Sequence, residues 1–190
     1  MRIISGTAKG RKLASFSGQQ IRPTSDRVRE AIFSMLLSRL GSFEGRAVLD
    51  LYAGTGAMAI EALSRGAARA VLVDPESQAT QLIRSNLQTC GFDQKGHHLR
   101  STVEAALPRL SAESFDLIFA DPPYGQGLAA ATLQFLSEQE LLMPGGLLCI
   151  ETARGEELPA TAGPLERHDW RRYGATAVHL YLRHQSEASR

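Results

Sequence analysis

The alternation of strand-like and helix-like segments through the middle of the chain constrains its fold most. Short apolar runs that are typical of buried strands alternate there with segments of helical periodicity. We predict strands at 47–51, 70–73, 97–101, 115–120 and 146–151, and helices at 56–65, 76–90, 103–110 and 127–137. This order is typical of an α/β fold, in which right-handed crossovers produce a parallel sheet with helices on both faces.

The last part of the chain departs from this order. Residues 167–173 and 177–182 are two strand-like runs that meet at Gly174 with no helix between them. Strands joined in this way pair antiparallel, so we predict a C-terminal hairpin at the edge of the sheet. The expected fold class is therefore α/β, with a seven-stranded, mostly parallel sheet.

The front of the chain predicts a short N-terminal β-hairpin within residues 1–21, followed by a helix between an N-cap at Ser25 and Gly41. A length of 190 residues fits one domain. We divide the chain into a basic hairpin extension at 1–21, a main domain at 22–185 and a tail at 186–190.

Composition excludes two classes of protein. Two cysteines, Cys90 and Cys149, cannot form a disulfide framework. No apolar run reaches the roughly 18 residues of a membrane span, and the N-terminus lacks the apolar stretch of a secretion signal. We therefore expect a reduced cytoplasmic protein without a membrane partner.

Charge is distributed unevenly along the chain. The net charge is +1, but residues 1–40 carry +6 and residues 41–190 carry −5. A basic front end favours a polyanionic partner such as nucleic acid. Chance clustering of charges on a solvated face is the alternative.

A glycine-rich turn follows the first predicted strand of the sheet. It contains Gly54 and Gly56 and opens the next helix, so its backbone can approach a ligand closely. The spacing also fits a dinucleotide fingerprint. Asp50 in the strand end would repel a pyrophosphate and could receive an ammonium, which favours a ligand with an amino-acid moiety.

A second acid, Asp74, ends the next strand, 24 residues after Asp50. A carboxylate at this place is suited to hydrogen bonds with the two hydroxyls of a ribose. The alternative is a strand-end turn in which Asp74 caps the following helix.

The tetrapeptide at 121–124, Asp-Pro-Pro-Tyr, directly follows the fourth strand. In open α/β sheets, ligands lie outside the carboxyl ends of the strands. Neither proline has an N–H, so the carbonyls and Asp121 form a group of acceptors that suits an amino group. Tyr124 offers a flat face to a base. A rigid turn with a buried tyrosine is the alternative.

Together these motifs resemble the class I methyltransferases, which have a Rossmann-like fold and use S-adenosylmethionine. The order of segments over nearly the whole chain is similar to the RsmD-type 16S ribosomal RNA guanine-N(2) methyltransferases. The segments are GTAKGRKL (6–13), RPTSDRVREAIFSML (22–36), DLYAGTGAMAIEALSRGA (50–67) and DPPY (121–124). The second of these is the part specific to the family.

The resemblance implies a role for each group of residues. The target amine would meet Asp121, Pro122, Pro123 and Tyr124. The cofactor would meet Asp50, Leu51, Tyr52, Ala53, Gly54, Thr55, Gly56, Asp74, Val103, Glu104, Thr24 and Arg27, with adenine near Val103 and Glu104. The RNA would meet Arg2, Lys9, Arg11, Lys12, Arg22 and Arg29.

The implied partner is 16S rRNA, in an assembling or assembled small ribosomal subunit, and the implied protein is a monomer. Three alternatives remain: an amine methyltransferase for another rRNA, DNA adenine or protein glutamine; a dinucleotide-dependent oxidoreductase; and a non-catalytic RNA-binding protein. We expect no metal site, because the adjacent His97 and His98 point to opposite faces of a strand.

Overall fold

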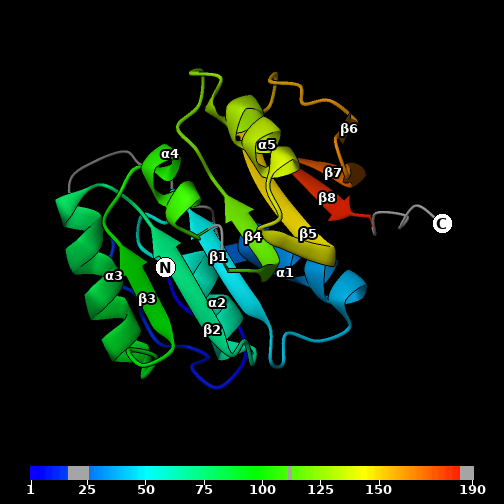
Figure 1. The fold of residues 1–190 in the computed structure, drawn as a ribbon. Helices are drawn as coiled ribbons and strands as arrows, with labels where there is room; N and C mark the ends of the chain where they lie inside the picture. Colours follow the sequence, from blue (N-terminus) through cyan, green and yellow to red (C-terminus); the bar gives the residue numbers. More distant parts are fainter. Residues whose placement is uncertain (17–25, 111–112, 185–190) are drawn as a thin grey trace.

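A computed structural model of the chain describes residues 1–16, 26–110 and 113–184 (Figure 1). The helices are α1 (Asp26–Leu40), α2 (Ala57–Ser64), α3 (Ser77–Cys90), α4 (Val103–Ala106), the 3-10 helix η1 (Leu107–Leu110) and α5 (Leu128–Glu138). The strands are β1 (Ala47–Leu51), β2 (Arg69–Val73), β3 (Gly96–Leu99), β4 (Phe115–Ala120), β5 (Leu142–Ala153), β6 (Thr161–Ala162), β7 (Leu165–Tyr173) and β8 (Thr176–Arg183).

All eight strands form one sheet in the order β3-β2-β1-β4-β5-β8-β7-β6. Strands β1 to β5 pair in parallel, and β8, β7 and β6 continue the sheet in antiparallel pairs. This confirms the α/β class, the parallel centre and the C-terminal hairpin. The sheet has one strand more than the seven expected, because the two-residue β6 is too short to produce a recognisable alternation in sequence.

The sheet separates two apolar layers. One face is covered by α1, α2 and α3, whose apolar side chains pack on Val48, Leu117 and Cys149. The other face is covered by α4, η1 and α5, which pack on Leu49 and Ile118. Figure 1 shows α4 and α5 in front of the sheet and α1 behind it. Consecutive residues of one strand thus face opposite layers, as the pleat requires.

The described part of the N-terminal segment, residues 1–16, is built into the first layer. It contains one antiparallel bridge, between Arg2 and Lys12, which is the expected hairpin in its shortest form. Ile3, Ala8 and Leu13 are buried in the same apolar cluster as α1, α2 and α3. The described part of the predicted extension is therefore packed into the core, and the predicted boundary at residue 21 lies outside the described residues.

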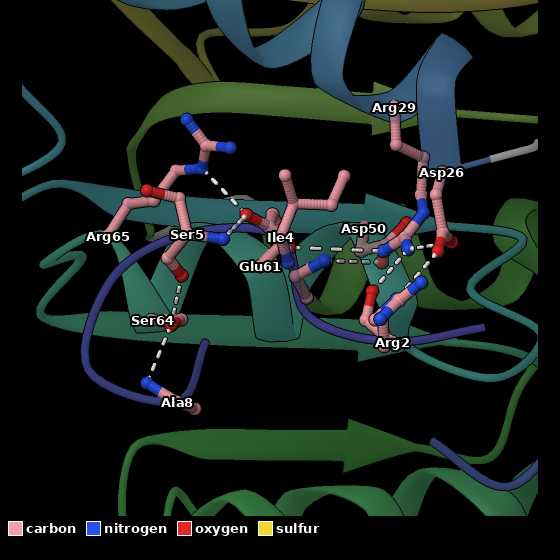
Figure 2. A network of polar contacts seen from close by, with 11 residues as sticks. Arg2, Ile4, Ser5, Ala8, Asp26, Arg29, Asp50, Glu61, Ser64 and Arg65 are labelled. Atoms are coloured by element: carbon pink, nitrogen blue, oxygen red, sulfur yellow. Dashed lines mark hydrogen bonds and ion pairs between the residues drawn. The ribbon is translucent and has the colours of Figure 1, made fainter. Parts of the chain in front are cut away.

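Two polar residues of α2 hold this segment in place (Figure 2). Glu61 has no exposed surface and accepts hydrogen bonds from the backbone N–H groups of Ile4 at 2.8 Å and Ser5 at 3.0 Å. The Ser64 hydroxyl accepts from the N–H of Ala8 at 2.9 Å. These bonds satisfy backbone groups that packing removes from water, partly at Ile4 and Ser5 and fully at Ala8.

Within the described residues, no helix combines the length and the apolar composition that a membrane span needs.

Candidate functional site

The motifs that the sequence singles out meet at one edge of the sheet. β1, β2, β3 and β4 are neighbours and run in parallel, so their carboxyl ends lie side by side. The glycine turn follows β1, and Asp74, Val103 and the 121–124 segment follow β2, β3 and β4. The predicted cofactor and amine sites are therefore adjacent in space.

The glycine turn has a backbone that few residues can adopt. Gly54 and Gly56 have φ values of 54° and 76°, in the left-handed region. A Cβ on Gly56 would lie 2.8 Å from Cδ2 of Leu72, so even a methyl group would not fit there. Tyr52 is the one non-glycine residue with a positive φ, 61°, in the described part of the chain. Such strain, about 1–3 kcal/mol per residue, is concentrated at binding sites in folded proteins.

Asp74 fastens the turn to the next strand. One carboxylate oxygen accepts from the N–H of Gly54 and the other from the N–H of Glu76, both at 2.9 Å. Glu76 is the N-cap residue of α3, so Asp74 holds the turn that leads into this helix, but it accepts from the N–H of the N-cap residue and not from an N–H within the helix. Each carboxylate oxygen retains a further lone pair, which leaves acceptors for the two hydroxyls of a ribose.

Asp50 lies beneath the turn. Only 4% of its surface is exposed, and its carboxylate accepts from the N–H of Ala59 in the first turn of α2 at 3.0 Å. Burial raises the pKa of Asp50 to about 8, and the charges of Asp121 and Asp74 act in the same direction. Asp50 therefore supports the turn through α2, and its contact with a cofactor ammonium stays a prediction.

The 121–124 segment is open to solvent on one side. Pro122 is buried, whereas Asp121, Pro123 and Tyr124 are exposed. The exposed Tyr124 contradicts the alternative of a buried tyrosine in a rigid turn. Its hydroxyl hydrogen bonds with that of Thr176 at 3.0 Å, which places the segment against the β7–β8 turn.

Asp121 is exposed as a residue, but its carboxyl group is partly desolvated by the protein atoms around it. This partial desolvation raises the pKa of Asp121 to about 6. The group is thus an anionic acceptor at neutral pH and loses that charge in mild acid.

The end of β3 contributes Val103 and Glu104. Val103 is buried and begins α4, which is capped by the Thr102 hydroxyl; Glu104 is exposed. Burial raises the pKa of Tyr52, and the Glu104 charge adds to that increase. Tyr52 and Glu104 thus both belong to the carboxyl-end edge of the sheet, and their contact with a cofactor stays a prediction.

One residue predicted to contact RNA is not available to it. Arg29 is 1% exposed, and its guanidinium donates to the carbonyl of Arg2 and, at 2.9 Å, to the carboxylate of Asp26 (Figure 2). A phosphate cannot reach it, so the prediction for Arg29 is wrong. In the sequence, Arg29 looks like its neighbouring surface arginines. Its burial could not be predicted because the carbonyl that accepts from it belongs to Arg2, 27 residues earlier.

The other predicted RNA-binding residues that the structure describes are exposed. Arg2, Lys9, Arg11 and Lys12 lie on the N-terminal segment. Arg2 pairs with Asp26 at 3.5 Å, and Arg11 donates to the carbonyl of Thr89, near the end of α3. Their contacts with RNA stay predictions.

Two of the predicted residues, Thr24 and Arg22, lie outside the described residues, as does the predicted cap Ser25. Arg27 is described and exposed in the first turn of α1. Its role toward the cofactor stays a prediction.

Two buried polar residues near the site have roles that the sequence did not reveal. Asn86 has no exposed surface, exchanges hydrogen bonds with the backbone of Ala14 and donates to the carbonyl of Thr55 at 2.9 Å. It thereby joins the N-terminal segment to the glycine turn. Glu151 lies in the second half of β5, at the end of an apolar run. Asp50 and Asp74 occupy the same kind of position at β1 and β2, so this pattern could have singled out Glu151 from the sequence.

The structure also contains a group of potential metal ligands away from this edge. Ligand atoms of Glu166, His168 and His184 lie within 4.8 Å of one another, and all three residues are exposed. β7 begins and β8 ends there. The group therefore lies at the opposite ends of the strands from the 121–124 segment. The candidate site itself contains acids and backbone groups.

Comparisons with known proteins show the family and the fold that this chain is similar to. The profile of the family "Conserved hypothetical protein 95" matches residues 1–182. Ribosomal RNA small subunit methyltransferase D of Escherichia coli (strain K12) is 32% identical over 185 residues, which cover 96% of this chain and 90% of that protein. The solved structure of yhhF from Escherichia coli superposes with a TM-score of 0.84 at 32% identity and covers 97% of this chain and 98% of its own.

A more distant structure has the same fold. The RNA methyltransferase of Salinibacter ruber, solved with S-adenosyl-L-homocysteine, superposes with a TM-score of 0.65 at 15% identity. The superposition covers 88% of this chain and 97% of that one.

Proposed function

The chain belongs to the Conserved hypothetical protein 95 family, which is the RsmD family, and we propose that it transfers a methyl group from S-adenosylmethionine to ribosomal RNA. The substrate we propose is the exocyclic N(2) amine of a guanine in 16S rRNA. The observation that carries the proposal is the position of the Asp121 carboxylate and the Pro122 carbonyl, two acceptors, at the same strand ends as the glycine turn and Asp74.

The residues present fit S-adenosylmethionine. The glycine turn offers backbone groups without side chains in the way, and Asp74 retains acceptors for ribose hydroxyls. The carboxylate of Asp74 places negative potential at the turn, which favours a cationic ligand over a pyrophosphate. When bound, the cofactor supplies an electrophilic methyl group on its sulfonium.

The target amine needs help from the protein, because the guanine ring delocalises its lone pair. Asp121 and the carbonyl of Pro122 each accept a hydrogen bond from one N–H of the amine. These two hydrogen bonds localise the nitrogen lone pair and aim it at the methyl group. Well-oriented groups supply several kcal/mol in this way, up to about 7–11. Asp121 then takes up the proton that the methylated amine releases.

The target base must leave its stack to reach Asp121. Tyr124 is 43% exposed and held through its hydroxyl by Thr176, so its ring can receive a base. The exposed cations of the N-terminal segment are suited to the RNA backbone at a distance from the chemistry. We further propose that the enzyme acts as a cytoplasmic monomer on an assembling or assembled small subunit.

Methyl transfer with labelled S-adenosylmethionine tests the proposal. The acceptors are small subunits and naked 16S rRNA from cells that lack this modification, with duplex DNA and ribosomal proteins beside them. Label in 16S rRNA alone supports the proposal. Label in DNA or protein favours another amine methyltransferase, RNA binding without label favours a non-catalytic protein, and binding of NADH instead of S-adenosylmethionine favours an oxidoreductase.

A further inference from the structure

A buried acid that the mechanism above does not use lies beside Asp121. Ala120 of β4 is paired with Ile150 of β5, so the residues that follow them, Asp121 and Glu151, are next to each other across the two strands. Phe119 and Cys149, two residues earlier, both face the layer of α1, α2 and α3. By strand alternation, Asp121 and Glu151 face the same layer.

Among the described residues, the groups found to face Glu151 are two acids, a thiol and an apolar side chain. Glu151 is 4% exposed. Asp121 faces it from β4, Asp50 from β1, the Cys149 thiol from its own strand and apolar Val178 from β8. Within the part of the chain that the structure describes, the carboxyl of Glu151 makes no ion pair and no hydrogen bond to a cation or backbone N–H.

A carboxyl in this position does not ionise readily. Burial raises the pKa of Glu151 well above its usual value, and the charges of Asp121 and Asp50 add to the increase. If two adjacent acids lie in a poorly hydrated site, one of them retains a proton, because like charges cannot both be accommodated. Of the two, Asp121 is exposed and Glu151 is buried, so the proton resides on Glu151.

We propose that Glu151 is a positioning residue, which stays protonated and donates a hydrogen bond to the carboxylate of Asp121. The inference rests on the proposed function of Asp121. The hydrogen bond stabilises the anionic form of Asp121 and fixes one of its oxygens, so that the other faces the target amine. Glu151 keeps its own proton throughout, and the proton from the amine passes to Asp121.

This role differs from that of a residue that merely fills space. A side chain of similar size without a donor would leave the core packed but the Asp121 carboxylate unsupported. The pair of substitutions Glu151→Gln and Glu151→Leu separates the two roles, because the amide of Gln donates a hydrogen bond and cannot ionise, whereas Leu cannot donate. Glu157→Gln, at an exposed acid in the loop after β5, is the matched control.

The experiment measures kcat, KM for 16S rRNA and the pH dependence of kcat for each variant, with cofactor affinity and urea unfolding as checks on folding. We expect Glu151→Gln to stay within about threefold of the parent chain. Glu151→Leu should lower kcat about 10- to 100-fold, the range for a lost hydrogen bond to a charged group, with KM unchanged. The acidic limb of the kcat–pH profile of this variant should shift to higher pH, because the carboxylate of Asp121 binds a proton more tightly when it lacks the hydrogen bond.

Two results would overturn the inference: equal losses in the Gln and Leu variants, or a Leu variant whose pH profile matches that of the parent chain. Carbon-13 NMR of the carboxyl groups in the free chain tests it without any substrate. Glu151 should stay protonated at pH 7 while Asp121 is ionised, and the reverse assignment contradicts the proposal. A parent chain that methylates no rRNA refutes the proposed function, whereas the NMR titration still decides the protonation of Glu151.

Discussion

Removal of the Glu61 carboxylate should destabilise the protein severely. Glu61 has no exposed surface and sits between two arginines: Arg65 donates to it at 2.8 Å, and Nη1 of Arg29 lies 3.9 Å away (Figure 2). It also accepts the N–H groups of Ile4 and Ser5. The substitution Glu61→Ala leaves both N–H groups without an acceptor and deprives Arg29 of one of its two acidic neighbours.

The expected loss follows from these contacts. Breaking a buried ion pair by removing one partner costs about 3–5 kcal/mol. Arg29 retains Asp26, but the two N–H groups left without an acceptor add their own cost, so we expect a loss in this range. Arg29 is 1% exposed, so its guanidinium cannot turn to water. With a total stability of about 5–15 kcal/mol, this loss would leave the chain partly unfolded at moderate urea.

Equilibrium unfolding in urea, followed by far-UV circular dichroism, measures the effect. With a slope of about 2 kcal/mol per molar, the midpoint should fall by about 1.5–2.5 M. The control is Glu113→Ala, which removes an ion pair with Arg69 that is about 40% exposed on each side, and should cost less than about 1 kcal/mol. Equal shifts in both variants, or a loss below about 1 kcal/mol for Glu61→Ala, would refute the reasoning.

Four further predictions concern the site and the N-terminal segment. Asp121→Ala should nearly abolish methyl transfer and leave cofactor affinity unchanged by calorimetry; a collapse of cofactor binding would place the 121–124 segment in the cofactor site. Asp74→Ala should weaken S-adenosylmethionine by about 1–3 kcal/mol, and an unchanged Kd would remove Asp74 from the ribose. The kcat/KM for RNA should fall as pH drops through about 6, because protonation removes the charge with which Asp121 accepts its hydrogen bond from the amine; a flat profile between pH 5 and 7 contradicts this. Deletion of residues 1–16 should lower the urea midpoint, since it exposes the surfaces that Ile3 and Leu13 cover, and an unchanged midpoint would show that the segment is dispensable.

The parallel centre of the fold could be predicted because its signals are local. Each strand is a short apolar run, each helix has its own periodicity, and parallel pairing brings every strand end to one edge. The acids at 50, 74 and 121 follow from that rule, and the structure places all three at the expected edge.

The N-terminal segment could not be predicted in the same way. Ile3, Ala8 and Leu13 follow neither a helical nor a strand period, so they carry no local signal of burial. Their partners lie on helices far along the chain. The burial of Arg29 has the same cause, because it depends on Glu61, 32 residues later, and no spacing rule links the two.

Glu151 illustrates a partial prediction. The strand and its end were predicted, but the meaning of its terminal acid depends on which strand lies beside it. The pairing of β4 with β5 supplies that information, because it brings Glu151 next to Asp121.

The identity of the methylated nucleoside tests the central claim most directly. 16S rRNA from cells that lack the modification would be incubated with the protein and labelled S-adenosylmethionine, digested to nucleosides and analysed by mass spectrometry. We predict one labelled product, N2-methylguanosine, that disappears with Asp121→Ala. Label on adenosine, on a ring nitrogen or on a ribose hydroxyl would contradict the assignment of the 121–124 segment to an exocyclic guanine amine.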